Sequence, residues 1–211
     1  GCCAFGSWAP VTVFAEFLGV PYLRALQGIS TESASLQISW VWIAMAIASP
    51  IAGWASNYLQ KRKLPLQVLL SVGLIASGLL IFYPPISSPL LMSILLFCIG
   101  VASSAQPITF GLIHDNNDSE VIATAMSFNN MVLISSGCIL QPLVGSIVSL
   151  CMQAFPGAEL FAYKIAFALT PASVLVSLAV LQLYVQETHC QKRTDASTTD
   201  TAYNANLGAV S

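Results

Sequence analysis

The sequence LPLQVLLSVGLIASGLLIFYPPISSPLLMSILLFCIGVASSAQPITFGLI occupies residues 64–113 and contains no charged side chain. A helix needs about 20 mostly apolar residues to cross the hydrocarbon of a bilayer, so this stretch predicts two membrane spans. The segment 83–89 between them is rich in proline and serine, which predicts a tight turn. Because water-soluble domains do not carry uncharged runs of this length, we expect the chain to lie in lipid.

The composition of the whole chain indicates the same environment. Of the 211 residues, 56% are hydrophobic and 8% are charged, against roughly 25% charged in ordinary soluble domains. A net charge of -2 offers no basic surface for nucleic acid, which we exclude as a partner. The six cysteines have neither a CxxC pattern nor the Cys/His spacing that zinc needs, so no metal and no cofactor are expected.

The uncharged windows predict six membrane helices in one transmembrane unit, residues 1–186. Their approximate bounds are 1–23, 34–58, 66–83, 89–113, 121–151 and 161–186. Residues 187–211 are rich in Thr, Ser, Asp, Asn and Ala, so we expect a polar and mostly disordered tail, above all from Asp195 to Ser211. The chain begins inside an apolar stretch without the charged segment of a signal peptide, which indicates a piece of a longer protein.

The positions of the basic residues predict the orientation in the membrane, because basic loops are retained in the cytoplasm. One side of the predicted bundle carries five of them: Lys61, Arg62, Lys63, Lys192 and Arg193. The opposite side carries two, Arg24 and Lys164. We therefore expect the C-terminus on the cytoplasmic side.

Two segments inside the predicted spans resemble each other. Residues 49–56 and 141–148 both read polar residue, Pro, two aliphatic residues, Gly, with Pro50 and Pro142 aligned and Gly145 matching Gly53. Each segment falls in the second helix of a group of three, so the copies run in opposite directions, as in a 3+3 inverted repeat. Pro and Gly would then bend and thin these helices for close packing. Ordinary packing in any multi-pass membrane protein is the alternative.

The loop 53–63, GWASNYLQKRK, resembles the cytoplasmic signature of the major facilitator superfamily, G-x-x-x-D-[RK]-x-G-x-[RK]-[RK]. Gly53, Arg62 and Lys63 match the signature. The family has Asp, a cation and Gly where this chain has Asn57, Tyr58 and Gln60. Because Asn57 cannot carry the charge of the signature's Asp, the resemblance predicts an inner gate that is held weakly, by hydrogen bonds.

Other parts of the chain are similar to bacterial members of this superfamily. Residues 8–22 resemble their seventh helix, residues 127–131 their eleventh, and Glu187-Thr188 the close of their twelfth. The resemblance implies the carboxy-terminal six-helix half of a twelve-helix transporter in the bacterial inner membrane. It implies an amino-terminal half as partner, a small-molecule substrate and transport by alternating access. A non-transporting remnant or scaffold that only packs with other helices remains the alternative.

Family members line their central cavity with the first, second, fourth and fifth helices of each half, which selects four polar candidates here: Glu16, Gln106, Asn129 and Asn130. A carboxylate within a span is costly, so Glu16 is expected to bind a cationic part of the substrate or a coupling proton. The alternative places Glu16 at a helix end among headgroups. The asparagines either line the cavity or bond neighbouring helices, and Gln106 precedes Pro107, which frees a backbone carbonyl.

Residues His114, Asp115, Asp118 and Glu120 form an acidic cluster in a predicted loop. A solvated loop explains it better than a metal site, because nothing in the spacing fixes a set of ligands. The sequence contains no HExxH or GxxxxGK[ST] motif, and both histidines lie at helix ends. An enzyme is therefore not expected.

Overall fold

The computed structural model describes residues 1–82 and 88–190, and over these ranges the chain is helical without strands. Six spans are long and apolar enough to cross a membrane, which confirms the predicted all-α membrane fold. Span one consists of α1 (Cys2–Pro10), a π-helix η1 (Val11–Leu18) and α2 (Gly19–Gln27). The others are α3 (Thr31–Tyr58), α4 (Lys63–Phe82), α5 (Pro89–Ser103) with α6 (Gln106–Asn116), α7 (Ile122–Ala154), and α8 (Glu159–Phe167) with α9 (Leu169–Tyr184).

Several predicted segments end elsewhere or lie outside the described ranges. Span one continues to Gln27 rather than 23, and span four to Asn116 rather than 113. Most of the predicted turn 83–89 and the tail from residue 191 onward, including Lys192 and Arg193, fall outside the described residues. The described start of the tail, residues 187–190, packs against the loop before α4.

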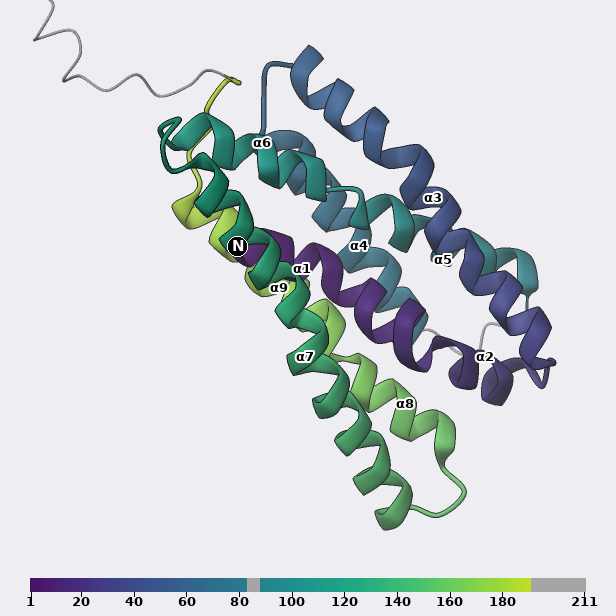
Figure 1. Cartoon of the computed structure of the whole chain (residues 1–211). Helices are drawn as coiled ribbons and strands as arrows, with labels where there is room; N and C mark the ends of the chain where they lie inside the picture. The colour runs from purple at the N-terminus through teal and green to yellow at the C-terminus, as the bar shows by residue number, and fades with distance from the viewer. Residues whose placement is uncertain (83–87, 191–211) are drawn as a thin grey trace, which may run out of the picture.

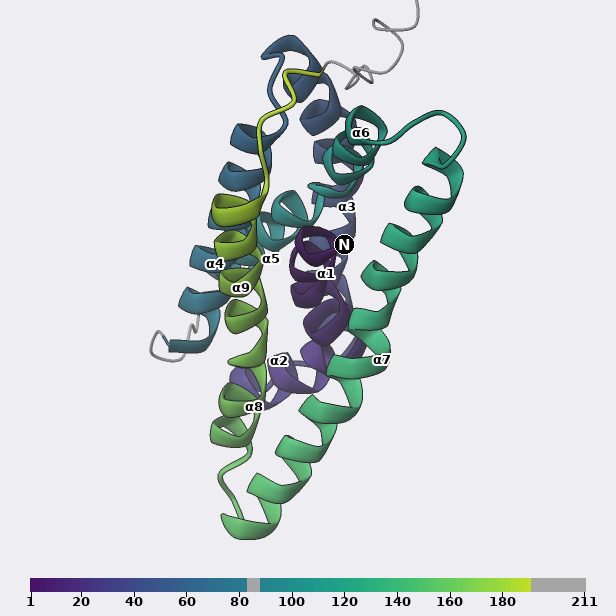
Figure 2. The ribbon, with the colours of Figure 1, turned by 90° about the vertical axis from the view of Figure 1, so that its left-hand side faces the viewer.

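Helix α1 lies at the centre of the bundle. Figure 2 shows it between α7 on one side and α4 and α9 on the other, with α5 behind it. Figure 1 shows α7 and α8 as a long hairpin at one end of the molecule and α3 running diagonally along its edge. Since α1 touches α4, α5, α7 and α9, the first span is the element around which the others pack.

Span four is broken where proline removes a backbone donor. Pro107, in the first turn of α6, cannot donate to a carbonyl of the preceding turn. The chain instead forms two tight turns, in which the N–H groups of Ser104 and Ala105 donate to the carbonyls of Val101 and Ala102 at 3.2 and 3.3 Å. The break separates α5 from α6 and sets the direction of Gln106.

An aromatic cluster joins span one to span six. The ring of Phe14 lies 5.7 Å from that of Tyr22 and 5.2 Å from that of Phe167. The Tyr22 ring lies 5.2 Å from Phe167 in an edge-to-face arrangement, which aromatic pairs favour. The Tyr22 hydroxyl donates to the carbonyl of Leu80 at 3.2 Å, so this buried polar atom also ties span one to α4.

The helix contacts recur in the two groups of three, as an inverted repeat requires. A Cβ atom added to Gly53 in span two would lie 4.0 Å from Pro107 in span four. One added to Gly145 in span five would lie 3.5 Å from the Phe17 ring in span one. Spans two and five are equivalent in such a repeat, and so are spans four and one. Pro50 and Pro142 both lie inside continuous helices and are both exposed in this chain, Pro142 beside the cavity described below.

Close contact between α3 and α5 depends on Gly100. A Cβ atom there would collide with the carbonyl oxygen of Val41 and lie 2.7 Å from the Cβ of Ala44. We expect Gly100→Ala to lower the free energy of unfolding by about 2 kcal/mol, because the backbone must shift. The measurement is reversible unfolding in mixed micelles, with Gly78→Ala as the control. Gly78 has no atom within 4 Å of an added Cβ, so its replacement should leave stability unchanged or raise it by about 1 kcal/mol.

Candidate functional site

A cavity of about 1240 Å³ opens between span one, α6 and α7. Its wall is mainly apolar and aromatic, with Trp8 and Phe17 among the lining residues. A few amides and hydroxyls interrupt it: Thr12, Gln106, Asn130, Gln141, Ser146 and Ser149. An apolar wall with a few placed polar groups is typical of small-molecule sites.

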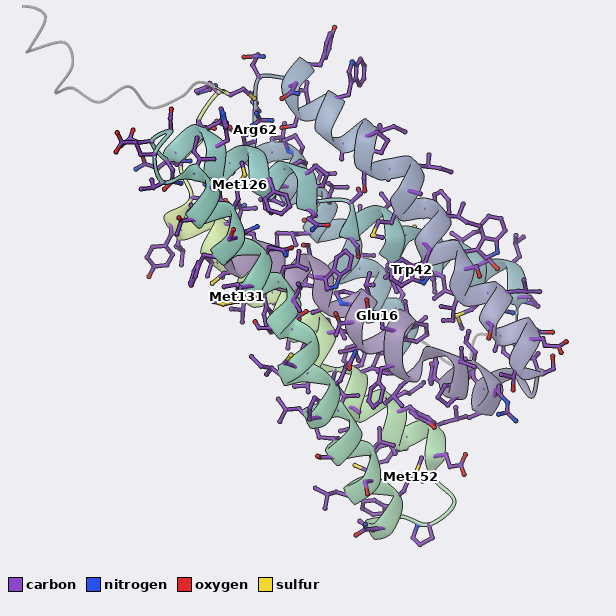
Figure 3. The ribbon with its side chains drawn as sticks, viewed as in Figure 1. Glu16, Trp42, Arg62, Met126, Met131 and Met152 are labelled. Carbon is purple, nitrogen blue, oxygen red and sulfur yellow. The ribbon has the colours of Figure 1, made fainter. Side chains whose placement is uncertain are left out.

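Glu16 is the one charged residue among those that line this cavity, all of which are described. It lies in the π-helix η1, a geometry that recurs at functional sites. It lies 11 positions before Gln27 at the end of the span, which is about 16 Å along a helix. Figure 3 shows Glu16 about midway along the bundle, whereas Arg62 is at one end.

Two polar contacts hold η1 against α7. The hydroxyls of Thr12 and Ser136 lie 3.3 Å apart, and the Gln141 amide donates to the Thr12 carbonyl at 3.3 Å. A π-helix disturbs the regular ladder of backbone hydrogen bonds, and a side-chain donor from another helix fits beside it. The sequence reasoning missed Thr12 and Trp8, because neither residue stands out within an apolar span.

The two neighbouring asparagines of α7 have different surroundings. Asn130 lines the cavity. Asn129 is buried against α6, where its amide donates to the Thr109 hydroxyl at 3.4 Å and its Oδ1 has no hydrogen-bond partner among the described residues. Successive helical residues point about 100° apart, so only one of the pair can face the cavity.

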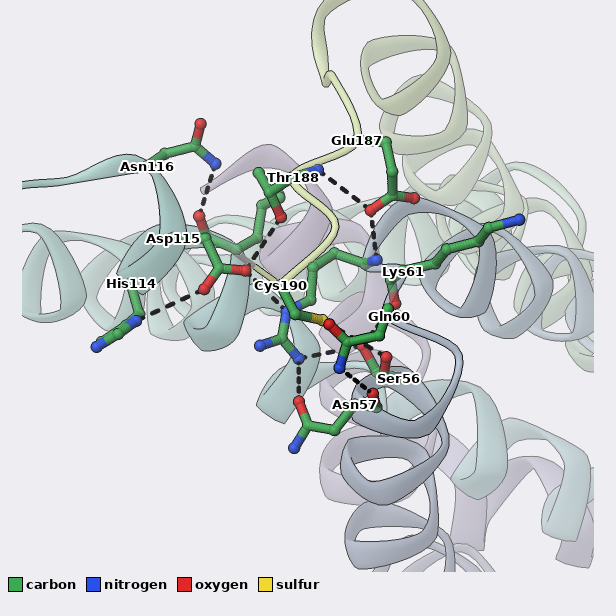
Figure 4. A network of polar contacts seen from close by, with 12 residues as sticks. Ser56, Asn57, Gln60, Lys61, His114, Asp115, Asn116, Glu187, Thr188 and Cys190 are labelled. Carbon is green, nitrogen blue, oxygen red and sulfur yellow. Dashed lines mark hydrogen bonds and ion pairs between the residues drawn. The ribbon is translucent and has the colours of Figure 1, made fainter. Parts of the chain in front are cut away.

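A polar network around Arg62 ties together the helix ends at the opposite part of the molecule from the α7–α8 hairpin (Figure 4). The Arg62 Nε donates to Asp115 Oδ2 at 2.9 Å, and Nη1 donates to Asn57 Oδ1 at 2.8 Å. Nη1 also donates to the Ser56 hydroxyl at 3.2 Å, and the Thr188 hydroxyl donates to Asp115 Oδ2 at 3.0 Å. We call these residues, together with Glu187, the Arg62 network.

Asp115 corrects two predictions. It was expected in a solvated loop, but α6 continues through Asn116 and the Asp115 side chain is only 4% exposed. The gate was expected to be held weakly, by hydrogen bonds, yet Arg62 forms an ion pair with this carboxylate in addition to its hydrogen bond with Asn57. Asp118 and Glu120 are exposed, and no three acidic, Cys or His residues in the described ranges come together to hold a metal.

Glu187 caps the N-terminus of α4 from the far end of the chain. Its carboxylate accepts hydrogen bonds from the backbone N–H of Arg62 at 2.6 Å and of Lys63 at 3.0 Å. These N–H groups have no partner inside the helix, and an anion is favoured there by the helix dipole. Burial by itself raises the pKa of Glu187, but backbone donors from Arg62, Lys63, His189 and Thr188 outweigh it and hold the pKa below its ordinary value.

This depressed pKa predicts how acid acts on the cap. The stabilisation is present above the unfolded-state pKa of Glu, about 4.3, and is lost as the pH falls through the lower folded-state pKa. We therefore expect Glu187→Gln to destabilise the protein near neutral pH and to have no effect in stronger acid. The measurement is the difference in unfolding free energy between the two proteins against pH. Glu159→Gln, at the other end of the bundle, is the control and should show no such difference.

Comparison with known proteins identifies the family of this chain. A family model described as Major Facilitator Superfamily matches residues 1–142. The chain belongs to this superfamily. No curated protein and no solved structure matches the chain. The superfamily consists of transporters rather than enzymes, and membership makes the chain an integral, multi-pass membrane protein of the transporter type.

The facilitator signature loop is partly assembled in the structure. Arg62 and Asn57 belong to the Arg62 network, and Lys63 donates through Nζ to the carbonyl of Gln182 at 3.2 Å. Gly53 lies against Pro107. The residue that completes the ion pair, Asp115, is 53 positions from Arg62 in the chain and outside the facilitator signature. The sequence shows only an acid one residue after His114, at the end of an uncharged span, and this does not reveal its partner.

Proposed function

We propose that this chain is the carboxy-terminal six-helix half of a twelve-helix facilitator that moves a small solute by alternating access. The observation that carries the proposal is the open cavity beside span one, with Glu16 on its wall. An open wall of this kind needs a second half to complete a binding site near the middle of the membrane. The proposed setting is a bacterial inner membrane, with the Arg62 network and the C-terminus on the cytoplasmic side.

Alternating access requires that each half move as a unit. The Arg62 network supports this, because it joins the end of α3 through Asn57, the end of α6 through Asp115 and the start of α4 through Glu187. These contacts hold three spans and the start of the tail at fixed separations. The halves would then rock about the cavity while the helix ends of this half stay together.

Glu16 is the proposed coupling residue. A carboxylate facing a mainly apolar cavity attracts a cationic group of the solute or a proton. Glu16 lies far from both ends of span one, which favours a position in the cavity rather than among the lipid headgroups. Gln106, Asn130 and Gln141 on the same wall would orient the solute by hydrogen bonds, whereas Asn129 would stabilise the contact between α6 and α7.

Filling the cavity tests the proposal. We expect Gly145→Leu in the complete gene product to lower solute uptake roughly tenfold, because its side chain would extend beside Phe17 into the cavity. The measurement is accumulation of a panel of small solutes by cells that express the protein. Gly78→Leu, which adds the same side chain to an open position on α4, should leave uptake unchanged.

A non-transporting scaffold predicts a different result. If the folded protein accumulates none of the solutes above the background of the host cell, the transport proposal fails. The sequence upstream of Gly1 separates the two readings further, since a transporter predicts another six helices with a fuller copy of the signature loop.

A further inference from the structure

An apolar groove of about 300 Å³ runs between α3 and α4. It lies near the ends of these helices at which the Arg62 network is found. Helix α5 forms its floor through Val101 and Ser104. The α3 wall is built from small and aliphatic side chains, Ala48, Ile51, Ala52 and Ala55, and the α4 wall includes Val68. The groove shares no lining residue with the cavity around Glu16.

The depth of the groove matches one leaflet of a bilayer. It extends along α3 from Leu59 to Ala48, which is 11 residues or about 16 Å of helix. Half of the hydrocarbon core of a bilayer is about 15 Å thick. Leu59 and Leu64 lie at its mouth, where the chain leaves the membrane between α3 and α4. The groove therefore has the length of an acyl chain that enters from the leaflet on this side.

The loop beside the mouth of the groove carries a cation that forms no ion pair among the described residues. Lys61 lies between Leu59 and Leu64 in sequence, and its side chain is exposed and makes no polar contact within the described ranges. Figure 4 shows its ammonium pointing away from the Arg62 network. The nearby carboxylates are engaged, Asp115 with Arg62 and Glu187 with the N-terminus of α4. Asn57 adds no negative charge, so the mouth is positive.

We propose that this groove binds an anionic phospholipid. One acyl chain lies in the groove between α3 and α4, and the phosphate group contacts Lys61. Lipid and protein fit in two independent ways, since the apolar groove ends at headgroup depth and the charge beside its mouth has the sign that an acidic headgroup requires. Binding there would fill the space between α3 and α4 next to the Arg62 network and so stabilise this end of the half.

Photolabelling tests the proposal. The complete protein is placed in phosphatidylcholine nanodiscs that contain a small fraction of phosphatidylglycerol with a diazirine on its acyl chain. We expect the label to concentrate in peptides that span residues 48–69. Ala55→Leu, which fills the groove, should remove this labelling, whereas Ala46→Leu on an exposed surface of the same helix should not. Lys61→Gln should reduce it roughly fivefold, and Lys164→Gln at the other end should not.

Three results would overturn the proposal. Labelling spread evenly over all six spans would show that the groove is only bathed by lipid. Equal labelling of residues 48–69 by a diazirine-bearing phosphatidylcholine would remove the preference for an acidic headgroup. Unchanged labelling in Ala55→Leu, with the protein folded by its thermal unfolding profile, would place the lipid elsewhere. The lipid proposal does not depend on transport, so the failure of the lipid proposal would not contradict the transport proposal, and the reverse holds too.

Discussion

Replacing Asp115 with alanine is expected to lower the free energy of unfolding by about 3 kcal/mol, because the Arg62 guanidinium would be left without its counter-charge. Both side chains are largely buried, at 4% and 12% exposure, so water would replace the lost carboxylate poorly. The hydroxyl of Thr188 would also lose its acceptor. The remaining hydrogen bonds from Arg62 to Asn57 and Ser56 keep the cost at the lower end of the range for buried pairs.

Reversible unfolding in mixed micelles measures this effect. Asp118→Ala is the matched control, since Asp118 is exposed and its loss should change stability by less than about 0.5 kcal/mol. The double replacement Arg62→Met with Asp115→Leu removes both charges and should recover most of the lost stability. Equal effects of Asp115→Ala and Asp118→Ala would contradict the importance of the ion pair.

Replacing Glu16 with glutamine is expected to abolish the dependence of uptake on external pH and to lower the initial uptake rate by about tenfold or more. Glutamine keeps the size of the side chain and one accepting oxygen but carries no charge and takes up no proton. Loss of one partner of a contact between charged groups has an effect of this order. The measurement is the initial uptake rate of the transported solute against pH in cells that express the complete protein.

Controls separate the role of Glu16 from a general effect of the substitution. Glu32→Gln makes the same chemical change in the exposed first turn of α3, and uptake should keep its rate and its pH profile. Glu16→Asp retains the charge on a shorter side chain and should keep the pH dependence at a reduced rate. An unchanged pH profile in Glu16→Gln would remove this residue from coupling.

The membrane fold was predictable from sequence because it depends on local features. A charge-free run longer than a bilayer is thick can be read directly, as at residues 64–113, and the spans followed from such runs. The candidate site was predictable only in part. Gln106 and Asn130 line the cavity whereas Asn129 lies against α6, and the sequence does not distinguish them, since the direction of a side chain depends on the local winding of the helix and on its breaks.

The contacts between residues far apart in the chain were not predicted from the sequence. Asp115 reads as a loop acid because the end of α6 cannot be fixed within three residues from hydropathy alone. Its burial depends on Arg62, which is 53 positions away, and the cap on α4 comes from Glu187, 125 positions after Arg62. Such pairings follow from how the spans pack, which no local pattern encodes.

The cap that Glu187 places on α4 also sets a practical boundary for protein engineering. A fluorescent protein or affinity tag fused directly after Gln186 would delete the carboxylate and the Thr188 hydroxyl together, and would leave the Arg62 and Lys63 amides facing the solvent. A fusion that keeps the native residues to Cys190 preserves those bonds. Residues 187–190 thus fasten the C-terminal end of the last span to the middle of the polypeptide.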